Sequence, residues 1–267
     1  MDVLMFHDLR REHFELPLDR YRLSFDDGLY SHYYYMPCLE HQPQPLTFFI
    51  TTGFIRPGAA RPVFDGRYLE YREAAVYAQQ ALIAGDFSAF MTVEEVRRLA
   101  ARPNVRIGAH SHFHDVTLTD AHPKKPRPVS AWRQQRFAQV PADRLRGMSI
   151  RSRLAFRGHE FKGGVLRPRS EADWEKYIRS DTERCLEWFA RHLKLQPVLY
   201  GFPFNEYSPR LIEILKSYGF REFYAGSSVK HPEVIGRMDA ETLVAGQDGT
   251  PPNPLFRRGK RKGWNRS

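Results

Sequence analysis

The sequence has few cysteines: two among 267 residues, Cys38 and Cys185, which lie far apart and have no CxxC partner. So low a count excludes a disulfide framework, and the spacing excludes a zinc ribbon. We therefore expect both cysteines to be ordinary small core residues of a protein from a reducing compartment.

Long hydrophobic runs are also absent. The apolar stretch near the N-terminus, Val3–Phe6, is four residues long, has no basic leader before it and is followed by charged residues. A signal peptide needs a longer apolar region, and a membrane helix needs about 20 apolar residues in sequence. We expect a cytoplasmic protein without a membrane span.

Acidic residues are outnumbered, since 41 Lys and Arg against 31 Asp and Glu give a net charge of +10. The last twelve residues alone carry six cations and no acid. We expect residues 251–267 to form a solvated, flexible tail that touches anionic surfaces without specificity. Because zinc-finger, RNP and helix-turn-helix patterns are missing, we expect no specific binding of nucleic acid.

The sequence does contain short apolar, β-branched runs that alternate with segments of helical periodicity, which is typical of an α/β fold. Start and stop signals bound the expected helices, such as the capping box at Thr92 and the Ser208-Pro209 pair before Leu211–Tyr218. The longest expected helix is Ala172–Leu193. The expected strands are Val3–Phe6, Arg22–Phe25, Leu46–Thr51, Val105–Ala109, Val198–Phe202, Glu222–Ala225 and Val234–Met238.

Two long stretches, Arg56–Gly85 and Asp120–Ser170, interrupt this alternation. The first is expected to be helical over Tyr68–Ala84, and the second is rich in proline and arginine. Segments of this length in compact domains are usually lids or binding loops. Because no repeat or linker divides the chain, we expect one domain over residues 1–250 with two insertions.

Two adjacent carboxylates, Asp26 and Asp27, follow the expected strand Arg22–Phe25. They cannot both be buried and ionised without a cation nearby. Taken alone, the sequence Asp26-Asp27-Gly28 is equally typical of a solvated turn. A second cluster decides between these interpretations.

That cluster is His110, His112 and His114, which follow the expected strand Val105–Ala109. His110 and His114 are four residues apart and can turn their imidazoles to one side, as a divalent metal requires. A histidine cluster and a carboxylate pair at two strand ends together predict a metal site.

These residues resemble the motifs of the polysaccharide deacetylase superfamily (NodB-like, carbohydrate esterase family 4). Its first motif, [T/S]FDDG, matches Ser24–Gly28, and its second, H[S/T]xxH, matches His110–His114. The opening Leu4–Asp8 is similar to that of several such enzymes, and the resemblance extends roughly from Met1 to Asp239. It implies an α/β fold with a distorted, incomplete (β/α) barrel, in which we expect about seven parallel strands.

The resemblance also implies roles for these residues. Asp26 matches the general base, while Asp27, His110 and His114 match metal ligands and leave a coordination position open for water. Ser111 matches the position that braces the metal-binding loop. The ligands suit one divalent ion, zinc first, with cobalt, nickel or iron as alternatives.

The third motif, RxPY in the family, is only half present as Gly201-Phe202-Pro203-Phe204. Pro203 and Phe204 fit, so the Phe204 amide is the candidate oxyanion donor. The alternative is a strand end that packs its rings into the core. Gly201 stands where the family has the arginine that pairs with the base, and Arg157 and Arg237 are the candidate replacements.

The family's last motifs, DxxDW and LxH, are not found, so the general acid is not given by the resemblance. His231 is our candidate, with His159 and His7 as alternatives, and we also expect His7 near the substrate. Most of the predicted site residues follow expected strands directly, and the carboxyl ends of parallel barrel strands are where active sites gather.

The resemblance implies a hydrolase that removes an acetyl group from an N-acetylated sugar. We expect a polysaccharide precursor inside the cell, such as an intermediate of surface-polysaccharide (O-antigen type) synthesis. Arg151, Arg153 and Arg157 in the second insertion predict an anionic group on that substrate. Two alternatives are a cyclic amide or imide hydrolase of the same superfamily and a carbohydrate-binding relative without catalysis. We find no sequence signal for an oligomeric state.

Overall fold

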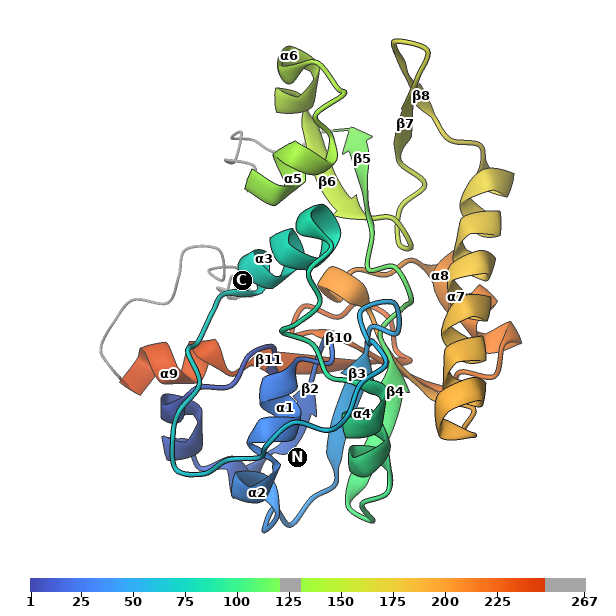
Figure 1. Ribbon diagram of the computed structural model, residues 1–267. Coiled ribbons are helices and arrows are strands. Elements are labelled where there is room, and N and C mark those ends of the chain that lie inside the picture. The colour runs from blue at the N-terminus through green and yellow to red at the C-terminus, as the bar shows by residue number, and fades with distance from the viewer. Residues whose placement is uncertain (121–130, 248–267) are drawn as a thin grey trace, which may run out of the picture.

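A closed barrel of parallel strands and a smaller antiparallel sheet make up the computed structural model, which describes residues 1–120 and 131–247 (Figure 1). The predicted tail, residues 251–267, lies outside the described residues. The barrel strands follow the order β1-β11-β10-β9-β4-β3-β2, and the last pairs with the first. They are β1 (Val3–Phe6), β2 (Arg22–Phe25), β3 (Leu46–Ile50), β4 (Val105–Ala109), β9 (Leu199–Gly201), β10 (Glu222–Gly226) and β11 (Val234–Asp239). The predicted barrel of about seven parallel strands is confirmed.

The barrel is distorted at one seam. β3 and β4 pair along five residues, whereas β4 and β9 pair only at Ala109 and Tyr200. His110 and Gly201 come directly after these two residues. The least regular part of the barrel wall therefore lies beside the predicted metal site.

Helices connect the strands where the capping residues predict them. Thr92 accepts a hydrogen bond from the Glu95 amide and so begins the α4 helix, and Ser208 begins α8 in the same way. The connecting helices are α1 (Tyr30–Tyr34), α2 (Met36–Leu39), α4 (Val93–Ala100), α7 (Glu171–Leu193), α8 (Pro209–Ser217) and α9 (Glu241–Gln247). Short helical turns are η1 (Arg11–Glu15), η2 (Leu18–Arg20) and η4 (Pro203–Asn205).

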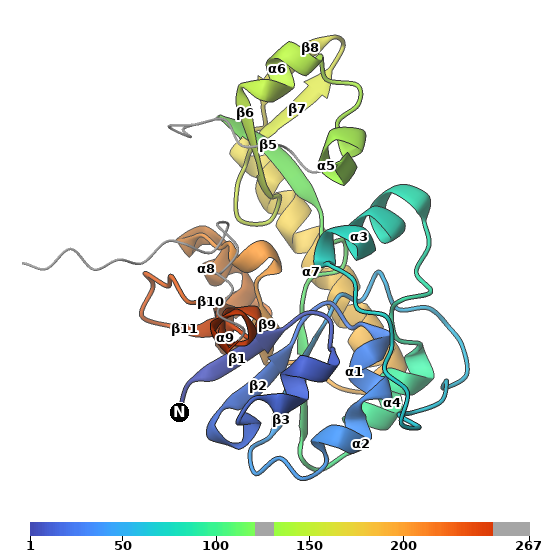
Figure 2. The ribbon, with the colours of Figure 1, turned by 90° about the vertical axis from the view of Figure 1, so that its left-hand side faces the viewer.

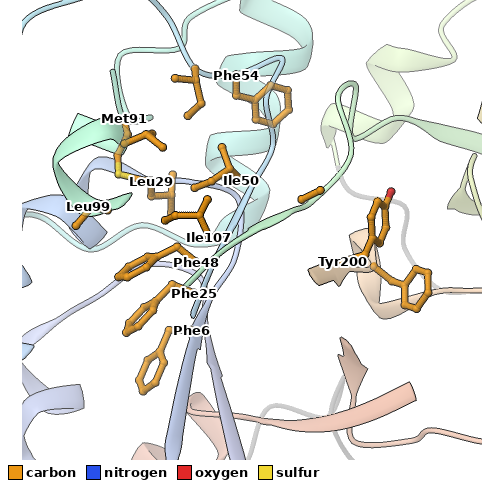
Figure 3. Packing of buried hydrophobic residues seen from close by; sticks show 14 of the residues in the cluster. Phe6, Phe25, Leu29, Phe48, Ile50, Phe54, Met91, Leu99, Ile107 and Tyr200 are labelled. Atoms are coloured by element: carbon orange, nitrogen blue, oxygen red, sulfur yellow. The ribbon is translucent and has the colours of Figure 1, made fainter. Parts of the chain in front are cut away.

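The main core includes a column of aromatic rings from three neighbouring strands (Figure 3). Phe25 of β2 stacks on Phe6 of β1 at 5.3 Å and on Phe48 of β3 at 4.7 Å, measured between ring centroids. His32 of α1 packs against Phe25 and Phe48. Burial of such large rings stabilises the barrel and fixes where β1, β2 and β3 end.

The first insertion crosses the carboxyl edge of the barrel. Its helices are α3 (Ala74–Gln79) and the π-helical turn η3 (Gln80–Ala84), so the helix predicted from Tyr68 begins six residues later. Residues 68–73 are not helical because they are tied to the barrel: Asp8 accepts hydrogen bonds from the Arg72 amide and the Tyr77 hydroxyl. This anchor holds the segment beside the end of β1.

The second insertion forms a sheet of its own, in the strand order β6-β5-β7-β8 (Figure 2). Its own small core contains Trp132 and Ile150, and Phe204 of the barrel packs against it. The insertion begins with β5, four residues before the predicted Asp120. Its elements are β5 (Val116–Asp120), α5 (Ala131–Arg136), α6 (Ala142–Arg146), β6 (Met148–Ser152), β7 (His159–Lys162) and β8 (Val165–Pro168).

The two cysteines differ in their surroundings. Cys185 is buried on α7, as predicted, whereas Cys38 is exposed on α2, so the prediction that it is a core residue is wrong. Among the described helices, none is both long enough and apolar enough to cross a membrane.

Candidate active site

Asp27, His110 and His114 meet at the carboxyl ends of β2 and β4. Asp27 Oδ1 lies 3.4 Å from His110 Nε2 and 3.3 Å from His114 Nε2. The side chains are largely buried, and their ligand atoms all lie within 4.8 Å of one another. The structure thus brings together the three residues predicted to hold a metal.

Unusual backbone angles hold these side chains in place. Of the six non-glycine residues with positive φ in the described part of the chain, five belong to this region. They are Asp27, Ser111, His114, Phe204 and Asn205. Since such conformations are costly for residues with a Cβ, their concentration here indicates that the loops are shaped for function and held by their surroundings.

The two histidines turn Nε2 towards Asp27, as ligands of one metal ion would. His110 Nδ1 donates a hydrogen bond to the Gly201 carbonyl at 2.8 Å, which turns Nε2 towards Asp27. Burial lowers the pKa of His114 to about 4, so its imidazole is neutral near pH 7. Burial would raise the pKa of Asp27, but its interactions with His114 and His110 hold it below its ordinary value.

One carboxylate oxygen of the site indicates that a cation binds there. Asp27 Oδ1 is buried and, among the described residues, has no hydrogen-bond partner. A buried carboxylate oxygen without a partner is costly unless something positive binds it. Two imidazole nitrogens and this oxygen form the ligand set of a catalytic divalent-metal site, so the residues fit the predicted ion.

Asp26 lies beside the triad and pairs with a buried arginine. Arg237 of β11 donates two hydrogen bonds to the carboxylate, at 2.6 Å and 2.8 Å, and a third to Asn205 Oδ1 at 3.1 Å. Burial alone would raise the pKa of Asp26, but Arg237 outweighs it and the pKa lies below the ordinary value. Asp26 is therefore an oriented carboxylate and not part of a solvated turn.

The partner of Asp26 comes from a different strand than the family motif would suggest. A Cβ at Gly201 would lie 2.8 Å from the Phe49 ring and 3.1 Å from His110 Nδ1, so no arginine fits there. Arg237 reaches Asp26 from the last strand instead. The other candidate, Arg157, is exposed in the second insertion and is not the partner.

The histidine loop is braced from two sides. Ser111 Oγ accepts a hydrogen bond from the His114 amide at 3.0 Å, consistent with the bracing role predicted for Ser111. Asp181 of α7 accepts hydrogen bonds from the amides of His112 and Phe113. The middle histidine, His112, turns away from the triad and contacts Thr52 Oγ1 through Nδ1 at 2.9 Å.

Sequence analysis missed Asp181, although it left a signal. Asp181 interrupts the apolar face of α7, where Ile178 and Cys185 are buried on either side of it. A fully buried carboxylate on such a face needs donors from elsewhere in the fold. Burial raises the pKa of Asp181 to about 6.

Phe204 joins the triad to the second insertion. Its ring lies 4.5 Å from the ring of His114, and its φ of 59° turns the backbone out of the preceding strand direction. Pro203 before it is buried. The role of the Phe204 amide as an oxyanion donor stays a prediction.

The three histidines that are candidates for the general acid lie in different parts of the fold. His231 precedes β11, whereas the site lies at the carboxyl ends of the strands, and its contacts are with Tyr207 and Glu233. It is therefore out of place for a general acid. His159 lies in the second insertion and pairs with Asp120.

His7 follows β1 at its carboxyl end, beside the end of β2, because Phe6 and Phe25 are paired and His7 and Asp26 come directly after them. It lines a cavity of about 520 Å³ together with Asn205 and Arg237. A cavity of this size accommodates a small ligand. Of the three histidines considered, His7 is the one that lies at the site.

Comparison with known proteins agrees with this geometry. The polysaccharide deacetylase family profile matches residues 17–223. A de-N-acetylase from Aggregatibacter actinomycetemcomitans has a similar structure, with a TM-score of 0.57, 16% identity, and 90% of this chain and 95% of that chain covered.

The deacetylase domain of BpsB from Bordetella bronchiseptica gives a TM-score of 0.57 at 15% identity, over 89% of this chain and 94% of the other. IcaB from Ammonifex degensii gives 0.52 at 15% identity, over 91% and 95%. At these identities the likeness establishes the fold. A search among curated proteins found no match.

Proposed function

The chain belongs to the polysaccharide deacetylase family, and on that premise we propose that it removes the acetyl group from an N-acetylated sugar of a polysaccharide or its precursor. The observation that carries this proposal is the buried Asp26–Arg237 pair beside Asp27, His110 and His114. A base held next to a metal site is what hydrolysis of an amide needs, and binding alone has no use for it. The similar structure described as a de-N-acetylase supports testing N-acetyl groups first.

Each residue of the site then has a task. A divalent ion held by Asp27, His110 and His114 would polarise the acetyl carbonyl and acidify the attacking water. Asp26 accepts the proton of that water, and Arg237 keeps the carboxylate ionised and aimed. The Phe204 amide faces the oxygen on which negative charge develops.

We assign the general acid to His7 in place of His231. As the C–N bond breaks, the leaving amine needs a proton, and His7 lies on the cavity side of the site with Arg237 and Asn205. We further propose that the substrate is an intermediate of surface-polysaccharide (O-antigen type) synthesis. Zinc is the ion to test first, followed by cobalt, nickel and iron.

The test is acetate release from N-acetylglucosamine oligomers by protein loaded with each metal, with a cyclic amide as the rival substrate. Asp26→Asn should lower kcat by about 10²–10⁴, the usual cost of losing a positioned base, while bound metal stays stoichiometric. Asp143→Asn, on the exposed surface of α6, is the matched control and should stay active. A fully active Asp26→Asn variant would contradict the assignment of the base.

A further inference from the structure

The arginines of the second insertion fall into two groups by their partners. Arg136 and Arg153 form ion pairs with Asp115, and Arg151 pairs with Glu206. Each of these three guanidiniums is thus engaged by a carboxylate of the protein, although Arg136 and Arg153 share the single charge of Asp115. Arg157, which the sequence also suggested for substrate binding, is exposed. Arg151 and Arg153 therefore already have carboxylate partners in the protein, and the anion-binding role of Arg157 stays a prediction.

Arg133 on α5 is different. Its Nε is buried and has no hydrogen-bond partner among residues 1–120 and 131–247, and no described carboxylate lies within ion-pair distance of it. The acid that acts on it most, Glu206, is already engaged by Arg151 Nε at 2.5 Å and the Ser152 amide at 2.6 Å. Residues 121–130 contain no Asp or Glu that could serve instead.

The guanidinium lies close to the catalytic centre. Arg133 Cζ is 5.6 Å from the centroid of the Phe204 ring, and that ring is 4.5 Å from the ring of His114. The ring of Trp132 also lies near the guanidinium, with its centroid 5.3 Å from Cζ. Arg133 and the metal ligand His114 thus both lie against the ring of Phe204.

A half-buried arginine that has no ion pair with any described residue is unfavourable, and burial lowers the pKa of Arg133 accordingly. A carboxylate or phosphate would restore the balance, because the planar guanidinium donates two parallel hydrogen bonds to either group. The aromatic rings beside it reduce screening by water, which strengthens such a contact.

We propose that Arg133 binds an anionic group, a carboxylate or a phosphate, on the sugar next to the acetylated one. This inference rests on the proposed deacetylase function and specifies its substrate class. It assigns the second insertion a direct part in choosing the substrate, through one residue that sequence analysis did not single out.

The experiment compares three N-acetylglucosamine disaccharides: a neutral one, one with a neighbouring glucuronic acid, and one with a phosphate ester on the neighbouring sugar. Wild-type protein should prefer one of the two anionic substrates, and which one it prefers separates carboxylate from phosphate. Arg133→Gln should raise the KM for that substrate roughly tenfold to a hundredfold, as loss of a charged hydrogen bond does. Its kcat, and its activity on the neutral disaccharide, should change little.

Arg144→Gln removes the same charge from the exposed surface of α6 and should leave the preference intact. Equal loss on neutral and anionic substrates in Arg133→Gln would show that Arg133 only supports Phe204 and would overturn the proposal. So would a wild type without preference. If metal-loaded wild type hydrolyses none of the three, the deacetylase proposal fails. Calorimetric titration of the disaccharides into wild type and Arg133→Gln then decides the anion site separately.

Discussion

The Asp26–Arg237 pair concentrates two opposite charges in the barrel interior, where both side chains are almost completely buried. Removing charges from water is costly. Their mutual attraction offsets that cost, together with the hydrogen bonds that Arg237 donates to Asp26, Asn205, Ser24 and the Ala225 carbonyl. Arg237 thus keeps Asp26 ionised for catalysis, and each of the two buried charges is stable only while the other is present.

Replacement of one partner should therefore cost more than replacement of both. Arg237→Gln leaves Asp26 buried without a counter-ion and should lower the free energy of unfolding by about 3–5 kcal/mol. The double variant Asp26→Asn/Arg237→Gln should be less destabilised than Arg237→Gln alone. Urea unfolding of the wild type, both single variants and the double variant measures this, and strictly additive effects would show that the pair is not coupled.

Asp181 gives a prediction about pH. Its pKa is about 6 in the folded protein, and the ordinary value is 3.8. Between about pH 4 and 6 the folded state holds a proton that the unfolded state has lost, so stability falls as pH rises through this window. Relative to Asp181→Asn, the wild type should lose roughly 2–2.5 kcal/mol from pH 4 to pH 7.

Unfolding free energies of wild type and Asp181→Asn at pH 4, 5, 6 and 7 test this expectation. The comparison cancels the contributions of other titrating groups that both proteins share. A difference that stays constant across the series would mean that Asp181 is not protonated preferentially in the folded state.

At this scale, sequence alone identified the residues that lie in short motifs. His110 and His114 lie four residues apart in the chain. Asp27 follows another strand of the same barrel, and the carboxyl ends of the two strands must lie at the same edge. Arg237 and Asp181 act over more than 60 residues of separation from their partners. Their pairing depends on how β11 and α7 pack, which composition and local spacing do not encode.

Among the secondary-structure elements, β9 shows how closely the barrel wall fits the site. Gly201 offers its carbonyl to His110 and leaves room for the Phe49 ring and for the His110 imidazole. A side chain at this position would displace one of the two. The glycine is therefore needed for its size, since its backbone is not in the left-handed region.

Gly201→Ala should weaken metal binding, because the added Cβ would lie 2.8 Å from Phe49 and 3.1 Å from His110 Nδ1. We expect at least a tenfold loss of metal affinity, the usual effect of disturbing a residue that orients a ligand. Gly147→Ala is the matched control, because its Cβ would meet nothing closer than 3.6 Å. Metal titration of both variants tests this expectation. Unchanged metal affinity in Gly201→Ala would contradict it.

The elements of the barrel were predictable for a physical reason that does not extend to the insertions. Strands that are buried along their whole length are mostly apolar runs, so β1 and β3 stand out in the sequence. The strands β7 and β8 are half-exposed and carry charged residues, and they form a sheet only by pairing with β5 and with each other. Their sequence looks like a loop because tertiary pairing, not burial, makes them strands.

On the scale of the whole molecule, the two insertions meet above the barrel. Ala78 and Leu82 of the first pack against the core of the second, and Phe204 joins the same cluster from the barrel. Figure 2 shows α3 lying between the barrel and α5. The site is therefore enclosed by segments that the barrel itself does not require, which is how one barrel fold can serve different substrates.

The metal site also links distant parts of the barrel, since Asp27 follows β2 and the two histidines follow β4, with β3 between them. An ion that binds only the folded state stabilises it by about 2.7 kcal/mol at a hundredfold excess over its Kd. For a chain of this size that corresponds to a rise in Tm of roughly 5–10 °C.

Zinc or cobalt should produce this rise in wild type stripped of metal by a chelator. Asp27→Ala, His110→Ala and His114→Ala should not respond and should lose stoichiometric metal. His112→Ala is the matched control, because it removes a histidine of the same loop that contacts Thr52 instead of the triad, and it should respond like wild type. Retention of stoichiometric metal by the three triad variants, or its loss from His112→Ala alone, would place the ion elsewhere.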